Sequence, residues 1–108
     1  MVSTDTFRQL AMSLPGVSEE PHFENTSFRV QKKIFATLNV KANRGCVKLS
    51  EIDQSVFSAY DNTIIYAVPN AWGKQGWTNI ELKTVRKSVC HEALKTAYTL
   101  VSAKKSKK

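Results

Sequence analysis

The stretch that decides the fold runs from Phe28 to Leu49 and reads FRVQKKIFATLNVKANRGCVKL. Apolar and polar residues alternate along it, as is typical of strands with one buried face. Two groups of turn-forming residues interrupt the alternation, Gln31-Lys32-Lys33 and Asn43-Arg44-Gly45. Asn and Gly accept the positive φ angles that tight turns require. The stretch therefore predicts a three-stranded β-meander whose core-facing residues are Ile34, Ala36, Leu38, Val40, Val47 and Leu49.

Segments on both sides of the meander have the apolar periodicity of helices. We expect one helix over residues 4–14, a second from the N-cap Ser50 to about Tyr60, and a third from Thr84 to about Ala103. The second helix is expected to bury Ile52, Val56 and Tyr60. Residues 17–24 predict a polar loop, and residues 63–68 and 77–82 predict two further strands, separated by a loop over 70–76.

The expected order of elements is α-β-β-β-α-β-β-α. Short turns between alternating strands favour an α+β fold, with a five-stranded antiparallel sheet, helices packed on one face and the other face partly open. A chain of 108 residues accommodates one domain. We expect that domain to occupy residues 1–103 and to be followed by a disordered lysine-rich tail, residues 104–108.

Composition excludes several classes of protein. The longest apolar run, Ile64 to Val68, is much shorter than the roughly 20 residues that span a bilayer. The first residues show no secretion signal, so we expect a cytoplasmic protein without membrane contact. Cys46 and Cys90 lie far apart and no C-x-x-C is present, which argues against a zinc site. No nucleophile, base and orienting group can be assembled from the sequence, so we expect no enzyme, no cofactor and no metal.

The charge of the chain points to a polyanionic partner. Sixteen Lys and Arg against nine Asp and Glu give a net charge of +7. Four lysines lie in the last five residues, which leaves 12 − 9 = +3 for the rest. Between residues 28 and 50 there are six bases and no acid. These bases are Arg29, Lys32, Lys33, Lys41, Arg44 and Lys48.

This basic meander, together with the lysine tail, predicts a nucleic-acid-binding protein, with DNA as the expected partner, that acts through phosphate contacts. The alternative is a solvated meander whose lysines protect the edges of the sheet. Lys74 lies in Gly73-Lys74-Gln75-Gly76, which matches the G-x-x-G loop of the KH fold. That loop joins two helices, whereas this one precedes a strand, so we interpret it as a glycine turn in which Lys74 can add a phosphate contact.

Aromatic residues suggest an alternative function, the binding of a protein or a small ligand on the open sheet face. Alternation along the meander places Phe35 outward, where an unpaired base can also stack on it. Alternation places Trp77 on the open face with Asn79 and Glu81, near Trp72. Trp77 can instead pack beneath the loop over 70–76.

Several short motifs, in this order and spacing, resemble the MmcQ/YjbR family over residues 4–103. They are Leu14-Pro15-Gly16, Phe28-Arg29-Val30, Lys33-Ile34-Phe35-Ala36, Val47-Lys48-Leu49, Gly76-Trp77 and Tyr98. The resemblance implies a compact α+β fold similar to bacterial frataxin, described as CyaY-like or double-wing. It also implies a DNA-binding label that rests largely on the fold, and it carries over no catalytic residue or cofactor. Members often have Gly in the first hairpin turn, where this chain has the more cationic Gln31-Lys32-Lys33.

Overall fold

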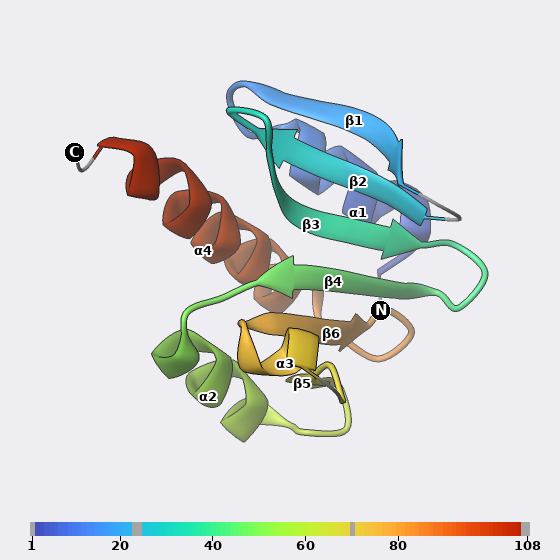
Figure 1. The fold of residues 1–108 in the computed structure, drawn as a ribbon. Helices are drawn as coiled ribbons and strands as arrows, with labels where there is room; N and C mark the ends of the chain where they lie inside the picture. The colour runs from blue at the N-terminus through green and yellow to red at the C-terminus, as the bar shows by residue number, and fades with distance from the viewer. Residues whose placement is uncertain (1, 23–24, 70, 107–108) are drawn as a thin grey trace.

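The computed structural model describes residues 2–22, 25–69 and 71–106, which form an α+β fold (Figure 1). Six strands make one antiparallel sheet in the order β1-β2-β3-β4-β6-β5. The helices are α1 (Thr4–Met12), α2 (Glu51–Tyr60), α3 (Ala71–Lys74) and α4 (Lys87–Ser106). The strands are β1 (Val17–His22), β2 (Asn25–Val30), β3 (Lys33–Asn39), β4 (Arg44–Lys48), β5 (Ile65–Ala67) and β6 (Trp77–Glu81).

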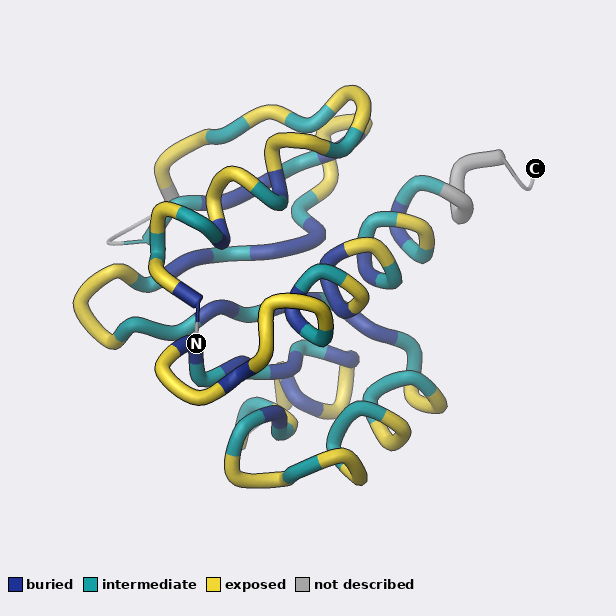
Figure 2. Tube along the Cα trace, turned by 180° about the vertical axis from the view of Figure 1, so that it is seen from behind, coloured by how far each residue is buried: buried dark blue, intermediate teal, exposed yellow. Residues whose placement is uncertain are grey.

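Two helices cover one face of the sheet. α4 contacts β2, β3 and β4, and α1 contacts β1, β3 and α4, so both lie behind the sheet in Figure 1. The core fills the space between these helices and the strands, and buried segments run along both layers in Figure 2. α2 contacts β5 and α3 contacts β6, at the other end of the sheet. None of the described helices combines the length and the apolar character that crossing a membrane requires.

The sheet has six strands, so the expected count of five was wrong. The additional strand is β1, which lies where we predicted a polar loop and pairs with β2 from Val17↔Val30 to His22↔Asn25. Its sequence, VSEEPH, carries charge and a proline, both of which are tolerated at a sheet edge because one side of an edge strand makes no ladder hydrogen bonds. Such a strand has little of the apolar alternation by which strands are recognised.

The terminal helices follow the predicted pattern, with different ends. Ser3 caps α1 by accepting a hydrogen bond from the Thr6 backbone N–H at 3.0 Å, and Phe7 and Ala11 of this helix are buried. α4 continues to Ser106, so the backbone of residues 104–106 is helical, where we predicted a disordered tail. Lys107 and Lys108, the rest of that tail, lie outside the described residues. The loop predicted over 70–76 contains the short helix α3.

A bulge in β3 overturns the predicted orientation of Phe35. Phe28 pairs with Ala36 and Arg29 with Ile34, so β3 contains one residue more than β2 at this point. A bulge of this kind changes the face to which the following side chains point. Phe35 and Ala36 are both fully buried, and the Phe35 ring meets Tyr98 of α4 edge-on, with 5.6 Å between ring centroids. Phe35 is therefore a core residue and offers no surface to a ligand.

The predicted helix after Ser50 is confirmed, but its predicted buried face was wrong. The Asp53 backbone N–H donates to the Ser50 side chain at 3.1 Å, which makes Ser50 the N-cap. The relative exposures of Ile52, Val56 and Tyr60 are 75%, 62% and 49%. The opposite side of the helix faces the protein, where Phe57 packs against the core and the Gln54 amide hydrogen-bonds to Gly73, Trp77 and Thr78. The packing of Phe57 and the hydrogen bonds of Gln54 thus hold this side of α2 toward the protein.

Candidate nucleic-acid interface on the open sheet face

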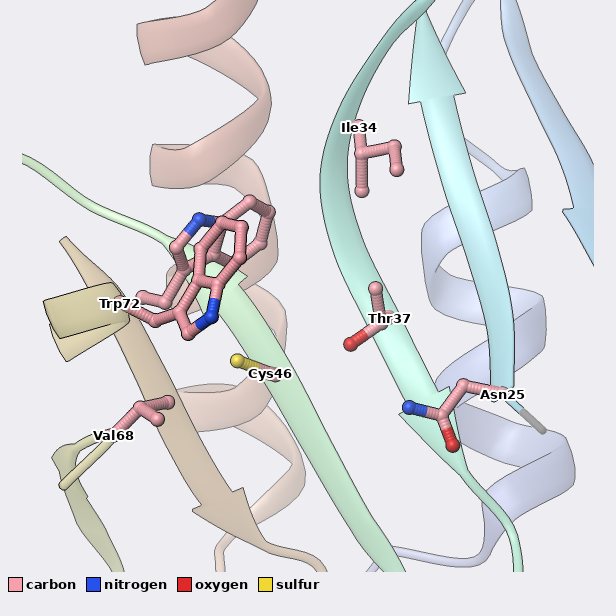
Figure 3. Close-up of a pocket in the computed structure, with 7 residues that line it drawn as sticks. Asn25, Ile34, Thr37, Cys46, Val68 and Trp72 are labelled. Carbon is pink, nitrogen blue, oxygen red and sulfur yellow. The ribbon is translucent and has the colours of Figure 1, made fainter. Parts of the chain in front are cut away.

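A cavity of about 360 Å³ lies on the face of the sheet opposite α1 and α4 (Figure 3). Its volume is in the range of pockets that hold small molecules. In Figure 3 the side chains of Trp72, Val68 and Cys46 line one side, and Ile34, Thr37 and Asn25 the other. The lining residues are Asn25, Ile34, Thr37, Cys46, Val68, Trp72 and Trp77.

Two tryptophans from different elements line this cavity. Trp72 comes from α3 and has a relative exposure of 57%. Trp77 begins β6 and is half-buried on the open face, as alternation predicted. Lys48 is the cross-strand neighbour of Trp77, and its Nζ lies 5.7 Å from the centroid of the Trp77 ring. This is cation–π geometry, so a positive charge and an aromatic surface lie together at the cavity.

The remaining predicted bases do not form one patch. Lys32 and Lys33 lie at the turn before β3, and Lys41 lies in the turn after it, about 23 Å away along a seven-residue strand. Lys48, at the end of the antiparallel β4, lies toward the same end of the sheet as Lys33. The six bases of the meander are therefore divided between the two ends of its strands.

Several of the bases already have acidic or other partners. Arg44 Nε donates to Glu81 at 2.9 Å, and Glu81 also accepts a hydrogen bond from the Tyr66 hydroxyl. Arg29 Nε donates to Ser27 at 3.1 Å and lies 3.9 Å from Glu20.

Lys74 does not line the tryptophan cavity. It borders a neighbouring cavity beside α2, together with Glu51 and Gln54. The unpaired cations of the meander at the end of β3 and β4 nearest Trp77 are Lys32, Lys33 and Lys48, which we call the near cations.

The turn that carries two near cations has an unusual backbone. Gln31 and Lys32 have φ angles of 54° and 69°, in the left-handed region that favours Gly. Both residues are exposed. Holding a non-glycine residue there costs on the order of 1 kcal/mol or more. The turn before β3 therefore exposes Lys32 at the expense of backbone strain.

Cys46 is the cavity residue with a titratable thiol. Burial raises the pKa of Cys46 to about 11, although hydrogen bonds from Thr78 and Thr37 act in the opposite direction. Burial likewise raises the pKa of Cys90 to about 12. Because the thiolate is the reactive form, both thiols are poor nucleophiles at neutral pH.

We expect both thiols to react very slowly with a thiol reagent in the folded protein at pH 8. With these pKa values, about one Cys46 in 1,000 and one Cys90 in 10,000 is ionised. Absorbance after addition of an aromatic disulfide measures the rate, and the same protein in denaturant is the control in which both thiols react fully. If Cys46 reacted as fast in the folded protein as in denaturant, burial would not raise the pKa of its thiol.

The described residues contain no group of three or more His, Cys, Asp and Glu side chains placed to hold a metal ion. Part of the open face was not predicted from the sequence. Ile34 was expected in the core, and Thr37, Cys46 and the Arg44–Glu81 pair were not singled out. The pairing of β4 with β6 brings Arg44 opposite Glu81, and strand alternation alone does not reveal which strands pair.

The fold places this protein among α+β domains with an antiparallel sheet covered by helices on one face. A family model described as YjbR matches residues 12–100. The chain belongs to the YjbR family, which confirms the resemblance seen in its motifs.

A solved structure shows the same fold. The crystal structure of protein DR2400 from Deinococcus radiodurans, which contains a DUF419 domain, aligns with a TM-score of 0.81 and 22% sequence identity. The alignment covers 94% of this chain and 80% of that chain. No curated protein matches the sequence.

Proposed function

We propose that this protein binds nucleic acid and holds an unpaired stretch of DNA on the open sheet face. The observation that carries the proposal is the joint placement of Trp72, Trp77 and Lys48 at one cavity. Proteins that bind single strands combine aromatic side chains, on which bases stack, with cations that follow the phosphates. The near cations supply the second part of this arrangement at the same end of the sheet.

The division of the bases favours a single strand over a duplex. A base that stacks on a tryptophan gains about 1–3 kcal/mol, and the flanking phosphates then lie within reach of the near cations. Three neutralised phosphates, one for each near cation, give a slope of about −2 in a plot of log K against log salt for a single strand. Lys41 lies at the far end of the sheet and Arg44 is paired with Glu81, so neither adds to this slope.

The test is the fluorescence anisotropy of a labelled single-stranded DNA 12-mer and its duplex, titrated with the full chain at several salt concentrations. Trp72→Ala is expected to weaken single-strand binding about 5- to 150-fold, the equivalent of one stacked base. Lys33→Gln is expected to weaken binding and to reduce the salt slope by about 0.7.

Lys41→Gln is the matched control, because Lys41 is also an exposed turn lysine but lies at the other end of β3. Equal effects of Lys33→Gln and Lys41→Gln, or no effect of Trp72→Ala, would contradict the proposed interface. A full-length variant with Gln at positions 104, 105, 107 and 108 tests the predicted contribution of the lysine tail. Complete loss of binding in that variant would reduce the interaction to general attraction by the tail.

A second candidate function is the binding of a small planar ligand in the same cavity. Of the two alternatives predicted for the open face, a protein or a small ligand, the cavity favours the small ligand. The volume of the cavity and its mainly apolar side chains favour it. The two functions differ in their dependence on salt, because apolar burial of an uncharged ligand releases no counterions. Quenching of tryptophan fluorescence by an uncharged aromatic compound, unchanged between low and high salt and lost in Trp72→Ala, would favour this candidate.

Two further parts of the proposal rest on the sequence. The resemblance implies the CyaY-like, double-wing form of the α+β fold. We also propose a cytoplasmic location, where nucleic acid is accessible and where free thiols such as those of Cys46 and Cys90 stay reduced.

A further inference from the structure

α2 presents an apolar stripe to solvent, on a different side of the molecule from the open sheet face. Ile52, Val56 and Tyr60 follow one another at four-residue steps and therefore lie on one side of the helix. Figure 2 shows exposed residues along α2, below α4 in that view. Large exposed apolar side chains that are contiguous are a mark of interaction sites.

The stripe borders a groove between α2 and α4. The groove has a volume of about 340 Å³. Its lining residues are Val56, Phe57 and Tyr60 of α2 with Ser88, Val89 and Glu92 of α4. Steps of four residues on a helix repeat every 6 Å, which matches the spacing of apolar anchors on a second helix laid along the stripe.

The helix that carries the stripe has a charge opposite to that of the whole protein. Between Ser50 and Asp61 the chain carries three carboxylates, Glu51, Asp53 and Asp61, and no Lys or Arg, although its net charge is +7. Hydrogen bonds from Thr63 hold the pKa of Asp61 below its ordinary value, so this carboxylate is ionised at neutral pH. Glu92 adds a further carboxylate on α4, where it pairs with Lys95 at 3.1 Å.

We propose that the groove between α2 and α4 binds a basic amphipathic helix of another protein. Apolar side chains of that helix, at four-residue spacing, contact Ile52, Val56 and Tyr60, and its Lys and Arg side chains face the carboxylates of α2. A second copy of this chain fits less well, because symmetric pairing of α2 with α2 sets carboxylates against carboxylates. An anionic membrane surface is disfavoured for the same electrostatic reason.

The test is the titration of isotope-labelled full chain with two synthetic helical peptides, followed by amide chemical shifts. Both peptides carry the same apolar residues at i, i+3, i+4 and i+7; one has Lys and Arg flanks and the other Glu and Asp flanks. The basic peptide is expected to bind with a Kd below about 1 mM and to shift α2 and residues 88–92. The acidic peptide is expected to bind at least about tenfold more weakly.

Two variants distinguish specific binding of the basic peptide in the groove from non-specific attraction to the protein. The double variant Ile52→Ser and Val56→Ser is expected to weaken binding of the basic peptide at least about tenfold while retaining the thermal unfolding transition, because both side chains are exposed. Val40→Ser is the matched control: Val40 is also exposed but lies beyond the end of β3.

Several results would overturn the proposal. These are equal binding of the two peptides, shifts confined to the open sheet face, an unchanged Kd in the double variant, or no binding of the basic peptide up to about 1 mM. A dimer of this chain that forms with increasing concentration and disappears in the double variant would identify the occupant as a second copy instead. Because Trp72→Ala leaves this groove intact, loss of DNA binding in that variant and loss of peptide binding in the double variant are separable.

Discussion

Replacement of Phe35 by alanine is expected to lower the free energy of unfolding by about 3–5 kcal/mol, the usual cost of removing a fully buried phenylalanine ring. Phe35 has no exposed surface and lies edge-on to Tyr98, so the substitution removes core contacts between β3 and α4. A loss of this size is a large part of the stability of a domain with 108 residues. Unfolding in urea, followed by tryptophan fluorescence, measures it.

Val40→Ala is the matched control for Phe35→Ala. Regular alternation predicts the reverse ranking, with Val40 in the core and Phe35 at the surface. In the structure Val40 is 60% exposed, so its truncation is expected to change the free energy of unfolding by no more than about 0.5 kcal/mol. Similar losses for the two variants, or a larger loss for Val40→Ala, would show that the bulge at Phe35 is absent in solution.

Replacement of Gly76 by alanine is expected to destabilise the fold by more than about 3 kcal/mol or to prevent folding. Gly76 has a φ angle of 106°, which side chains with L configuration rarely adopt and which costs about 1–3 kcal/mol. In addition, a Cβ at this position would lie 2.0 Å from the carbonyl oxygen of Leu49. Leu49 donates its backbone N–H to the Gly76 carbonyl at 2.9 Å, so the two segments cannot separate without losing this bond.

Gly16→Ala isolates the cost of the backbone angle from that of the close approach. Gly16 also has a positive φ angle, 75°, but a Cβ there meets no atom within 4 Å. We therefore expect a loss of only about 1–2 kcal/mol. Thermal unfolding of the two variants provides the comparison, and equal midpoints would argue against the contact between Gly76 and Leu49.

The glycine turn interpreted from Gly73-Lys74-Gln75-Gly76 agrees with this packing. A Cβ on Gly73 would lie 2.0 Å from the Val68 carbonyl oxygen, so both glycines of the motif permit close approach of backbone segments. The same spacing that suggests a phosphate loop therefore has a structural cause here. Lys74, between the two glycines, borders the cavity beside α2.

Local pattern predicted those elements whose residues have strong periodicity or clear caps. Ser50 begins α2 as expected, and the apolar periodicity between Thr84 and Ala103 predicted the helix α4. β1 escaped detection because an edge strand can be polar and can contain proline. The burial of Phe35 depends on a bulge whose position is set by the pairing of β2 with β3, which lies outside the reach of alternation within one segment.

The candidate interface was predictable only in part, for geometric reasons. Alternation was sufficient to place Trp77 on the open face, since Thr78 and Ile80 of β6 and Leu82 just beyond it are fully buried. The lysines of the meander are close in sequence but not in space, because a strand separates the turns at its two ends by its whole length. The pairing of Arg44 with Glu81 joins residues 37 positions apart, a relation that depends on strand order.

The position of β6 between β4 and β5 has a consequence for the growing chain. Among the described strands, β5 pairs with β6 alone, and β6 also completes the ladder of β4. During synthesis the four strands up to Lys48 can assemble as successive hairpins, but Ile65–Ala67 finds no ladder until Glu81 has left the ribosome. The segment that contains α2 and β5 therefore cannot complete its folding until β6, which is translated after it, is available for pairing.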